Sequence, residues 1–205
     1  MQPKAEFDIR SLEQLREIIP EPPAASHDKV EASLLPSFAE FIALSPFILV
    51  ATVDDQYQLD VSPKGDQPGF VKILDQTTLA IPERKGNRLA FGFQNILMSG
   101  AISLIFMIPG TRETLRINGR ARLSSDPDLL QQLTADGKSA LLATLVQVEQ
   151  VFFHCGKALI RSDLWQAANQ TTAGEASVRR YFSQRRSLSV QEVDQYLESN
   201  YQNER

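Results

Sequence analysis

The residues best suited to chemistry in this sequence are the basic side chains of the stretch 62–89. They fall near the ends of the strands expected there, where side chains leave the core and approach a common rim; they are Lys64, Arg84, Lys85 and Arg88. A helix expected to begin at Asn87 would add unpaired backbone N–H groups and the positive end of its dipole. Together these groups would suit a phosphate. A basic loop in solvent is the alternative interpretation, because no Walker or Rossmann pattern is present.

Few other residues fit a catalytic pattern. The two histidines are His27 and His154, and His154 precedes Cys155 at the end of an expected strand, where neighbouring side chains point to opposite faces and do not converge on one metal. Cys155 would need a base and an electropositive pocket to act as a nucleophile, and Lys157 or Arg161 could supply the field. No Ser-His-Asp order, HExxH helix or paired zinc-ligand spacing is identifiable. If the protein is an enzyme, a cofactor is expected to supply the reactive group.

Composition limits the class of protein. A chain of 205 residues with 42% hydrophobic and 22% charged residues is long enough for one substantial core. Its net charge of −4 argues against nonspecific nucleic-acid binding, which depends on basic surfaces. The single cysteine cannot form an intramolecular disulfide, and no signal-peptide pattern opens the chain, so a cytoplasmic location is expected. The longest apolar run, 101–109, is too short to span a bilayer, and membrane insertion is not expected.

Hydrophobic periodicity predicts an antiparallel β-protein with helices (α+β). Helices are expected near 11–19, 36–44, 87–97 and 127–134, with a final helix capped by Ser189 and Glu192. Alternating or continuous apolar runs predict strands at 47–53, 57–62, 70–74, 78–82, 101–108, 113–123 and 141–154. The segment 63–69 is expected to be a shaped loop, and 166–177 a polar, mobile one. Seven strands with tight hairpins and no parallel β/α alternation indicate an antiparallel barrel.

The strand 113–123 has two different faces. Apolar residues alternate there with a row that includes Arg116, Arg120 and Arg122. Exposed arginines on a strand usually solubilise it or protect a sheet edge, and a ligand role for the row is the alternative.

The order of several sequence blocks resembles a known family. The blocks are SPFILVATVD, SPKGD, PGFVKILD, TLAIPERKGNR, NILMSGAISLIFMIPG, ETLRINGRARL and HCGKALIRSDLW. Together they resemble the FMN-binding split-barrel proteins of the pyridoxamine 5′-phosphate oxidase-related type, over roughly residues 45–165. The resemblance implies a dimeric antiparallel split β-barrel, in which two chains bind two FMN molecules across their interface. It divides the chain into an N-terminal helical extension (1–44), the FMN-binding domain (45–165), and a linker with a C-terminal helix (166–205).

The resemblance also implies a set of cofactor-binding residues. The loop that approaches the flavin matches Ser62, Lys64 and Gly65; strand residues beside the ring or ribityl chain match Ile81 and Pro82; and the phosphate-binding turn matches Arg84, Lys85, Asn87 and Arg88. Positions that reach the flavin from the neighbouring chain match Thr114 and Arg116. In the last block, Lys157 and Arg161 would place positive charge near a reduced flavin.

Three positions depart from the family pattern. Lys64 stands where arginine is frequent, and it keeps the charge but loses the two-pronged hydrogen bonding of arginine. Lys85 and Gly156 stand where related sequences often have proline. The first change predicts weaker phosphate binding than is typical.

The expected function is therefore that of an FMN-dependent oxidoreductase acting as a homodimer, with a small-molecule substrate or a nicotinamide as electron donor. Vitamin B6 oxidation is not expected, because no second phosphate site is identifiable. One alternative is a non-catalytic flavin-binding or sensor protein. Another is a related barrel that uses a deazaflavin or haem.

Overall fold

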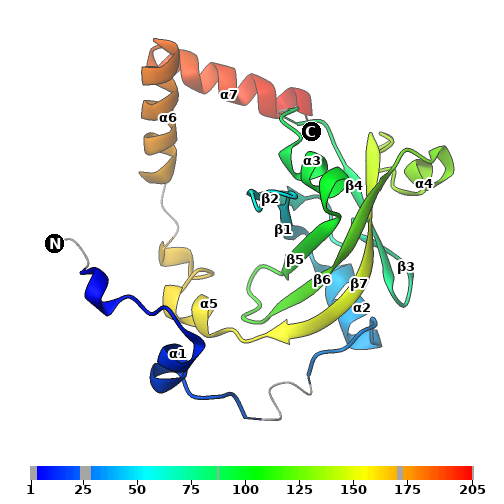
Figure 1. The fold of residues 1–205 in the computed structure, drawn as a ribbon. Helices are drawn as coiled ribbons and strands as arrows, with labels where there is room; N and C mark the ends of the chain where they lie inside the picture. Colours follow the sequence, from blue (N-terminus) through cyan, green and yellow to red (C-terminus); the bar gives the residue numbers. More distant parts are fainter. Residues whose placement is uncertain (1–3, 24–28, 87, 170–172, 205) are drawn as a thin grey trace.

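A single antiparallel sheet forms the body of the protein (Figure 1). The computed structural model describes residues 4–23, 29–86, 88–169 and 173–204. Seven strands are hydrogen-bonded in the order β2-β1-β5-β6-β7-β4-β3, and every pairing is antiparallel. Their bounds are β1 Phe47–Val53, β2 Leu59–Gly65, β3 Lys72–Asp75, β4 Thr78–Glu83, β5 Ala101–Met107, β6 Thr114–Ser124 and β7 Leu142–His154. The predicted class, an antiparallel split barrel with helices, is confirmed.

The hairpin of β1 and β2 extends further than the sequence indicated. Residues 63–65 were expected in a loop, yet β2 continues through them and pairs Gly65 with Phe47. Pro63 is tolerated because β2 is an edge strand, where a missing N–H removes no ladder bond on the open side. The extension matters for the site, because it keeps Ser62 and Lys64 on one face of a regular strand.

The main core lies inside the curved sheet. Its fully buried side chains come from alternate positions of the central strands, among them Ile48, Leu104, Phe106, Leu115 and Ile117. The helix α2 (Pro36–Leu44) packs Phe38 and Ile42 into this core, and Phe38 and Phe41 contact the ring of Phe153 on β7. The helix α2 therefore contributes to the core of the barrel, although it precedes residue 45, where the barrel domain was expected to begin.

The helix after β4 starts later than predicted. It is α3 (Phe91–Met98), and its N-cap is Ala90. Arg88 and Ala90 have positive φ angles of 61° and 56°, so the backbone there is incompatible with a continuous helix. The predicted first residue, Asn87, lies outside the described residues. The free N–H groups of the first helical turn therefore lie three or more residues beyond the position where a phosphate was expected to meet them.

Several smaller helices lie outside the strands. The N-terminal region contains η1 (Ala5–Phe7) and α1 (Leu12–Ile18), in which Ser11 caps the helix by accepting from the Gln14 N–H. The helix α4 (Pro127–Gln132) is capped by Asp126, as predicted, and it lies against a second small core that includes Leu133 and Ala143. No helix in the described part of the chain is long and apolar enough to cross a membrane.

The C-terminal region differs from the predicted mobile linker. After α5 (Lys157–Ser162) and η3 (Ala167–Asn169), the chain forms two helices, α6 (Ala173–Arg186) and α7 (Val190–Glu204). The capping box at the start of α7 is confirmed, because Glu192 Oε2 accepts from both the Ser189 N–H and hydroxyl, which lowers the pKa of Glu192. Sequence reasoning missed α6 because its basic, polar composition lacks a broad apolar face.

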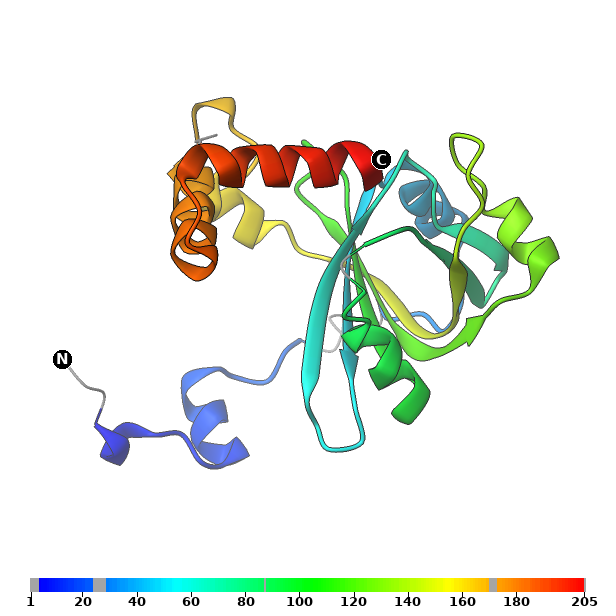
Figure 2. The ribbon, with the colours of Figure 1, turned by 90° about the horizontal axis from the view of Figure 1, so that it is seen from above.

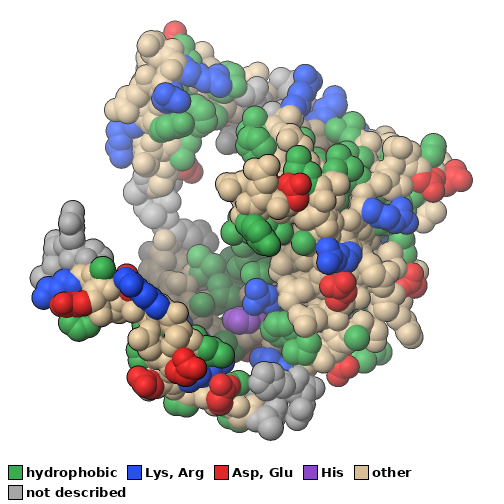
Figure 3. Space-filling view, viewed as in Figure 1, with side chains coloured by type: hydrophobic (Ala, Val, Ile, Leu, Met, Phe, Trp, Pro, Cys, Tyr) green, Lys and Arg blue, Asp and Glu red, His purple; other side chains and the backbone are tan. Residues whose placement is uncertain are grey.

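The two C-terminal helices meet at a corner that stands away from the barrel (Figures 1 and 2). Val193 is fully buried at this corner, Arg179 pairs with Asp194, and Arg186 stacks on Tyr196 at 4.2 Å. Figure 3 shows an opening between these helices and the barrel that side chains do not fill. The corner is therefore held by its own contacts.

Candidate functional site

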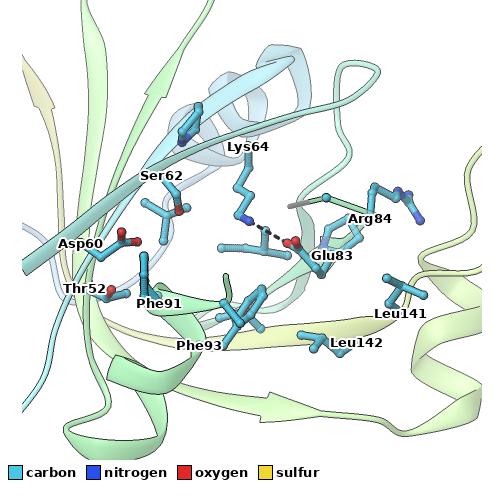
Figure 4. Close-up of a pocket in the computed structure, with 18 of the residues that line it drawn as sticks. Thr52, Asp60, Ser62, Lys64, Glu83, Arg84, Phe91, Phe93, Leu141 and Leu142 are labelled. Atoms are coloured by element: carbon cyan, nitrogen blue, oxygen red, sulfur yellow. Dashed lines mark hydrogen bonds and ion pairs between the residues drawn. The ribbon is translucent and has the colours of Figure 1, made fainter. Parts of the chain in front are cut away.

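A pocket of about 780 Å³ opens where the sheet remains split (Figure 4). Its walls are β1, β2, the end of β4, the connection to α3, the first turns of α3 and the start of β7. The volume falls in the range of about 300–1,000 Å³ that is usual for small-molecule and cofactor sites. Eight of the predicted cofactor residues line it: Ser62, Lys64, Gly65, Ile81, Pro82, Arg84, Lys85 and Arg88.

Two of the four predicted cations are already paired with carboxylates. Lys64 Nζ lies 2.8 Å from Glu83 Oε2 and 5.2 Å from the centre of the Phe93 ring. Arg84 donates from Nε to Asp66 Oδ2 at 3.0 Å and from Nη2 to the Leu133 carbonyl at 2.9 Å. Arg84 thus connects the end of β4 to the loops at Asp66 and Leu133. The sequence did not indicate this structural role.

The other two cations are available to a ligand. Lys85 and Arg88 are exposed on the rim, and neither forms an ion pair or a side-chain hydrogen bond with any residue in the described ranges. The left-handed backbone at Arg88 is uncommon for a residue with a Cβ, and such conformations are concentrated at functional sites. The rim therefore keeps two uncompensated positive charges beside the Lys64–Glu83 pair.

The opposite end of the pocket is rich in oxygen atoms. Thr52 and Asp60 are direct cross-strand partners of β1 and β2, and both line the pocket. The buried Asn95 donates its amide to Thr52 Oγ1 at 3.2 Å. A Cβ placed on Gly92, in the first turn of α3, would lie 3.2 Å from Asp60 Oδ2 and 3.5 Å from Thr52 Oγ1. These oxygen atoms therefore lie so close to Gly92 that a side chain at this position would contact them.

The walls between the two ends are largely apolar. Ile81 and Pro82 are neighbours on β4, both are buried, and both line the pocket. Phe91 and Phe93 line it from α3, and Leu141 and Leu142 line it from the start of β7 (Figure 4). A flat aromatic ligand would find apolar contact on several sides and polar groups at its two ends.

The remaining predicted residues do not line this pocket in the same chain. Thr114 and Arg116 lie on β6, on the outer face of the sheet, opposite His154 and Phe152. Lys157 and Arg161 are exposed on α5 beyond the end of β7. These four positions stay predictions for a site shared by two chains. Cys155 is exposed, and the described residues contain no cluster that could hold a metal ion.

Sequence reasoning missed Glu83, Asp66 and Asp60. The two carboxylates that neutralise Lys64 and Arg84 come from residues 19 and 18 positions away along the chain, and nothing local in the sequence reveals those pairings. Asp60 could have been found, because it alternates with Ser62 and Lys64 along one strand and must share their face.

The fold and pocket together define a split-barrel protein with a cofactor-sized site at its open edge. The family model described as pyridoxamine 5′-phosphate oxidase matches residues 34–155, which is more than half of the chain. The chain belongs to the pyridoxamine 5′-phosphate oxidase family. The match begins within two residues of α2, in agreement with the contribution of that helix to the core.

Solved structures of similar shape have low sequence identity. HupZ from Group A Streptococcus is 18% identical, with a TM-score of 0.48, over 58% of this chain and 93% of that one. A candidate pyridoxamine 5′-phosphate oxidase from Lactobacillus delbrueckii is 21% identical, with a TM-score of 0.46, over 60% and 95%. HutZ from Vibrio cholerae, described as a haem storage protein, is 16% identical, with a TM-score of 0.43, over 60% and 94%. No protein with a curated description matches the chain in sequence.

Proposed function

We propose that the protein binds FMN in the pocket between β2, β4 and α3 and acts as an FMN-dependent oxidoreductase. The observation that carries the proposal is the combination, in one pocket of about 780 Å³, of an apolar interior with a rim of cations. A phosphate dianion is expensive to desolvate, so its site needs several charged donors. Lys85 and Arg88 would hold the phosphate, with Lys64 beside them.

The residues of the interior fit the rest of the cofactor. Ile81, Pro82 and Phe93 offer apolar surface to a flat ring and would keep water from it. When bound, the flavin would supply hydride and electron transfer, and the protein would bind, orient and tune it. The open volume beyond the ring would admit a small substrate or a nicotinamide donor.

The absorption spectrum of the purified protein is the most direct test of cofactor identity. We expect the two visible bands of an oxidised flavin, release of FMN on denaturation, and saturable uptake when FMN is added to the apoprotein. Turnover of NADH or NADPH by the flavin-loaded protein would support the oxidoreductase, whereas tight FMN binding without turnover would favour a non-catalytic flavoprotein. A haem Soret band, or uptake of a deazaflavin in preference to FMN, would contradict the proposal.

The outer face of the sheet supports a second part of the proposal, a homodimer. Leu59 and Val61 on β2 are 77% and 61% exposed, and Phe47 on β1, which shares their face, is also exposed. Toward the centre of this face, Arg116 lies opposite Ile105 and Phe152, and its buried Nε has no partner among the described residues. A second copy would cover this apolar surface, and symmetric pairing is the most frequent solution.

We expect the purified protein to be a dimer at micromolar concentration, as measured by light scattering coupled to size-exclusion chromatography. Replacing Val61 with Glu should shift the equilibrium toward monomer, because the charge would be buried against the partner. The same change at Tyr57, which is 87% exposed at the hairpin tip, is the matched control and should leave the dimer intact. A stable, flavin-loaded monomer of the unmodified protein would exclude this arrangement.

A further inference from the structure

The inward face of β2 presents three polar side chains in a row. Asp60, Ser62 and Lys64 are spaced two residues apart, so they project from the same side of the strand into the pocket (Figure 4). Along the extended strand, the Cα atoms of Asp60 and Lys64 lie about 13 Å apart. The pocket is therefore polarised along its length, with hydrogen-bond acceptors at one end and cations at the other.

The acceptor end is organised by α3. The first turn of this helix lies against Asp60, and its dipole favours a carboxylate there. Asp60 forms no ion pair with any cation in the described part of the chain. Thr52 Oγ1 accepts from the buried Asn95 amide, so the hydroxyl proton of Thr52 is left for another acceptor. Ser62 Oγ lies 4.0 Å from the point above Gly92 on which these oxygens converge.

We propose that Thr52, Asp60 and Ser62 form the subsite that recognises the imide edge of the flavin ring, an inference that rests on the proposed function. The imide edge presents one N–H donor between two carbonyl acceptors. Asp60 supplies an acceptor for the N–H, and the hydroxyls of Thr52 and Ser62 on either side supply donors for the carbonyls. The three side chains thus match the ring edge group by group.

The position of the subsite favours the ring over the ribityl chain. The ribityl hydroxyls are attached next to the phosphate, whereas the imide edge is at the far end of the molecule. With the phosphate at the cationic end of the pocket beside Lys64, the group at Asp60, whose Cα is about 13 Å from that of Lys64 along the strand, is the ring edge. The ionised carboxylate would also disfavour negative charge on a reduced ring, so Asp60 would lower the flavin's reduction potential.

The test compares FMN with 3-methyl-FMN, in which a methyl group replaces the imide proton. For the unmodified protein we expect 3-methyl-FMN to bind at least about tenfold more weakly than FMN, because a charge-assisted hydrogen bond is lost. In Asp60→Asn, FMN should bind about tenfold more weakly, the difference between the two ligands should shrink to about threefold or less, and the reduction potential should rise. Fluorescence titration of each apoprotein and a dye-equilibration potential measure these quantities.

Glu83→Gln is the matched control, because it removes the same charge from the opposite end of the pocket. It should leave the ratio of the two affinities unchanged. Ser62→Ala, at a half-buried position, should weaken FMN and 3-methyl-FMN alike by about two- to fivefold, because both ligands keep the carbonyl to which its hydroxyl would donate, and this test stands even if Asp60→Asn proves unstable. Equal binding of FMN and 3-methyl-FMN by the unmodified protein would overturn the subsite and leave the FMN proposal standing. Binding of neither flavin would overturn both.

Discussion

Replacing Arg88 with Ala should weaken FMN binding by about ten- to a hundredfold while leaving riboflavin binding nearly unchanged. Arg88 is exposed on the pocket rim and has no partner among the described residues, so its charge is available to the phosphate. A charge-assisted hydrogen bond contributes on the order of 1.5 to 3 kcal/mol, which corresponds to that range of affinity. Alanine keeps a Cβ at the left-handed position, so the backbone cost is the same in both proteins.

The measurement is a flavin-fluorescence titration with FMN and riboflavin at fixed salt. Lys85→Ala should behave like Arg88→Ala, because it removes the other uncompensated charge. Arg84→Ala is the contrasting variant, since it would leave Asp66 and the Leu133 carbonyl without their partner. That change should lower the unfolding midpoint and affect both flavins alike. If Arg88→Ala weakens riboflavin as much as FMN, the arginine shapes the pocket and does not hold the phosphate.

The strands could be predicted from the sequence because buried and more exposed residues alternate along them, and this alternation is visible in the order of apolar and polar residues. In β5 every second residue is buried, and the same pattern in β1 and β6 placed them within one or two residues of their observed bounds. The boundaries that sequence reasoning missed depend on nonlocal or unusual backbone. The continuation of β2 past Pro63 requires its pairing with Phe47, and the late start of α3 follows from two positive φ angles.

The convergence of the basic residues could be predicted from the sequence, but the ion pairs that some of them form could not. The basic residues of 62–89 do converge on one pocket, as their positions at strand ends suggested. Their charges are not equivalent, because Glu83 and Asp66 reach Lys64 and Arg84 across the pocket. Pairings between residues almost twenty positions apart depend on the folded geometry. The proposed phosphate-binding role therefore narrows to Lys85 and Arg88, and composition and spacing alone could not have distinguished these two residues from Lys64 and Arg84.

Gly119→Ala should destabilise the protein strongly, although the substitution adds only one methyl group. Gly119 lies on β6 where the pairing with β7 shifts by one residue, since Asn118 pairs with Gln150 and Gly119 with Val148. A Cβ at this position would lie 2.0 Å from the backbone oxygen of Gln147. The obstacle is main chain of a central strand, so no side-chain rotation can relieve it, and the longest pair of strands must separate or lose hydrogen bonds.

We expect Gly119→Ala to lower the free energy of unfolding by about 3 kcal/mol or more, measured by urea denaturation of the apoprotein. Gly174→Ala is the matched control, because a Cβ there meets no atom within 4 Å and alanine is favoured inside a helix such as α6. Its unfolding midpoint should equal or slightly exceed that of the unmodified protein. An unfolding midpoint of Gly119→Ala within error of the unmodified protein would show that β7 can move aside at the bulge. In that case, the close approach of β6 and β7 would not explain why glycine stands at this position.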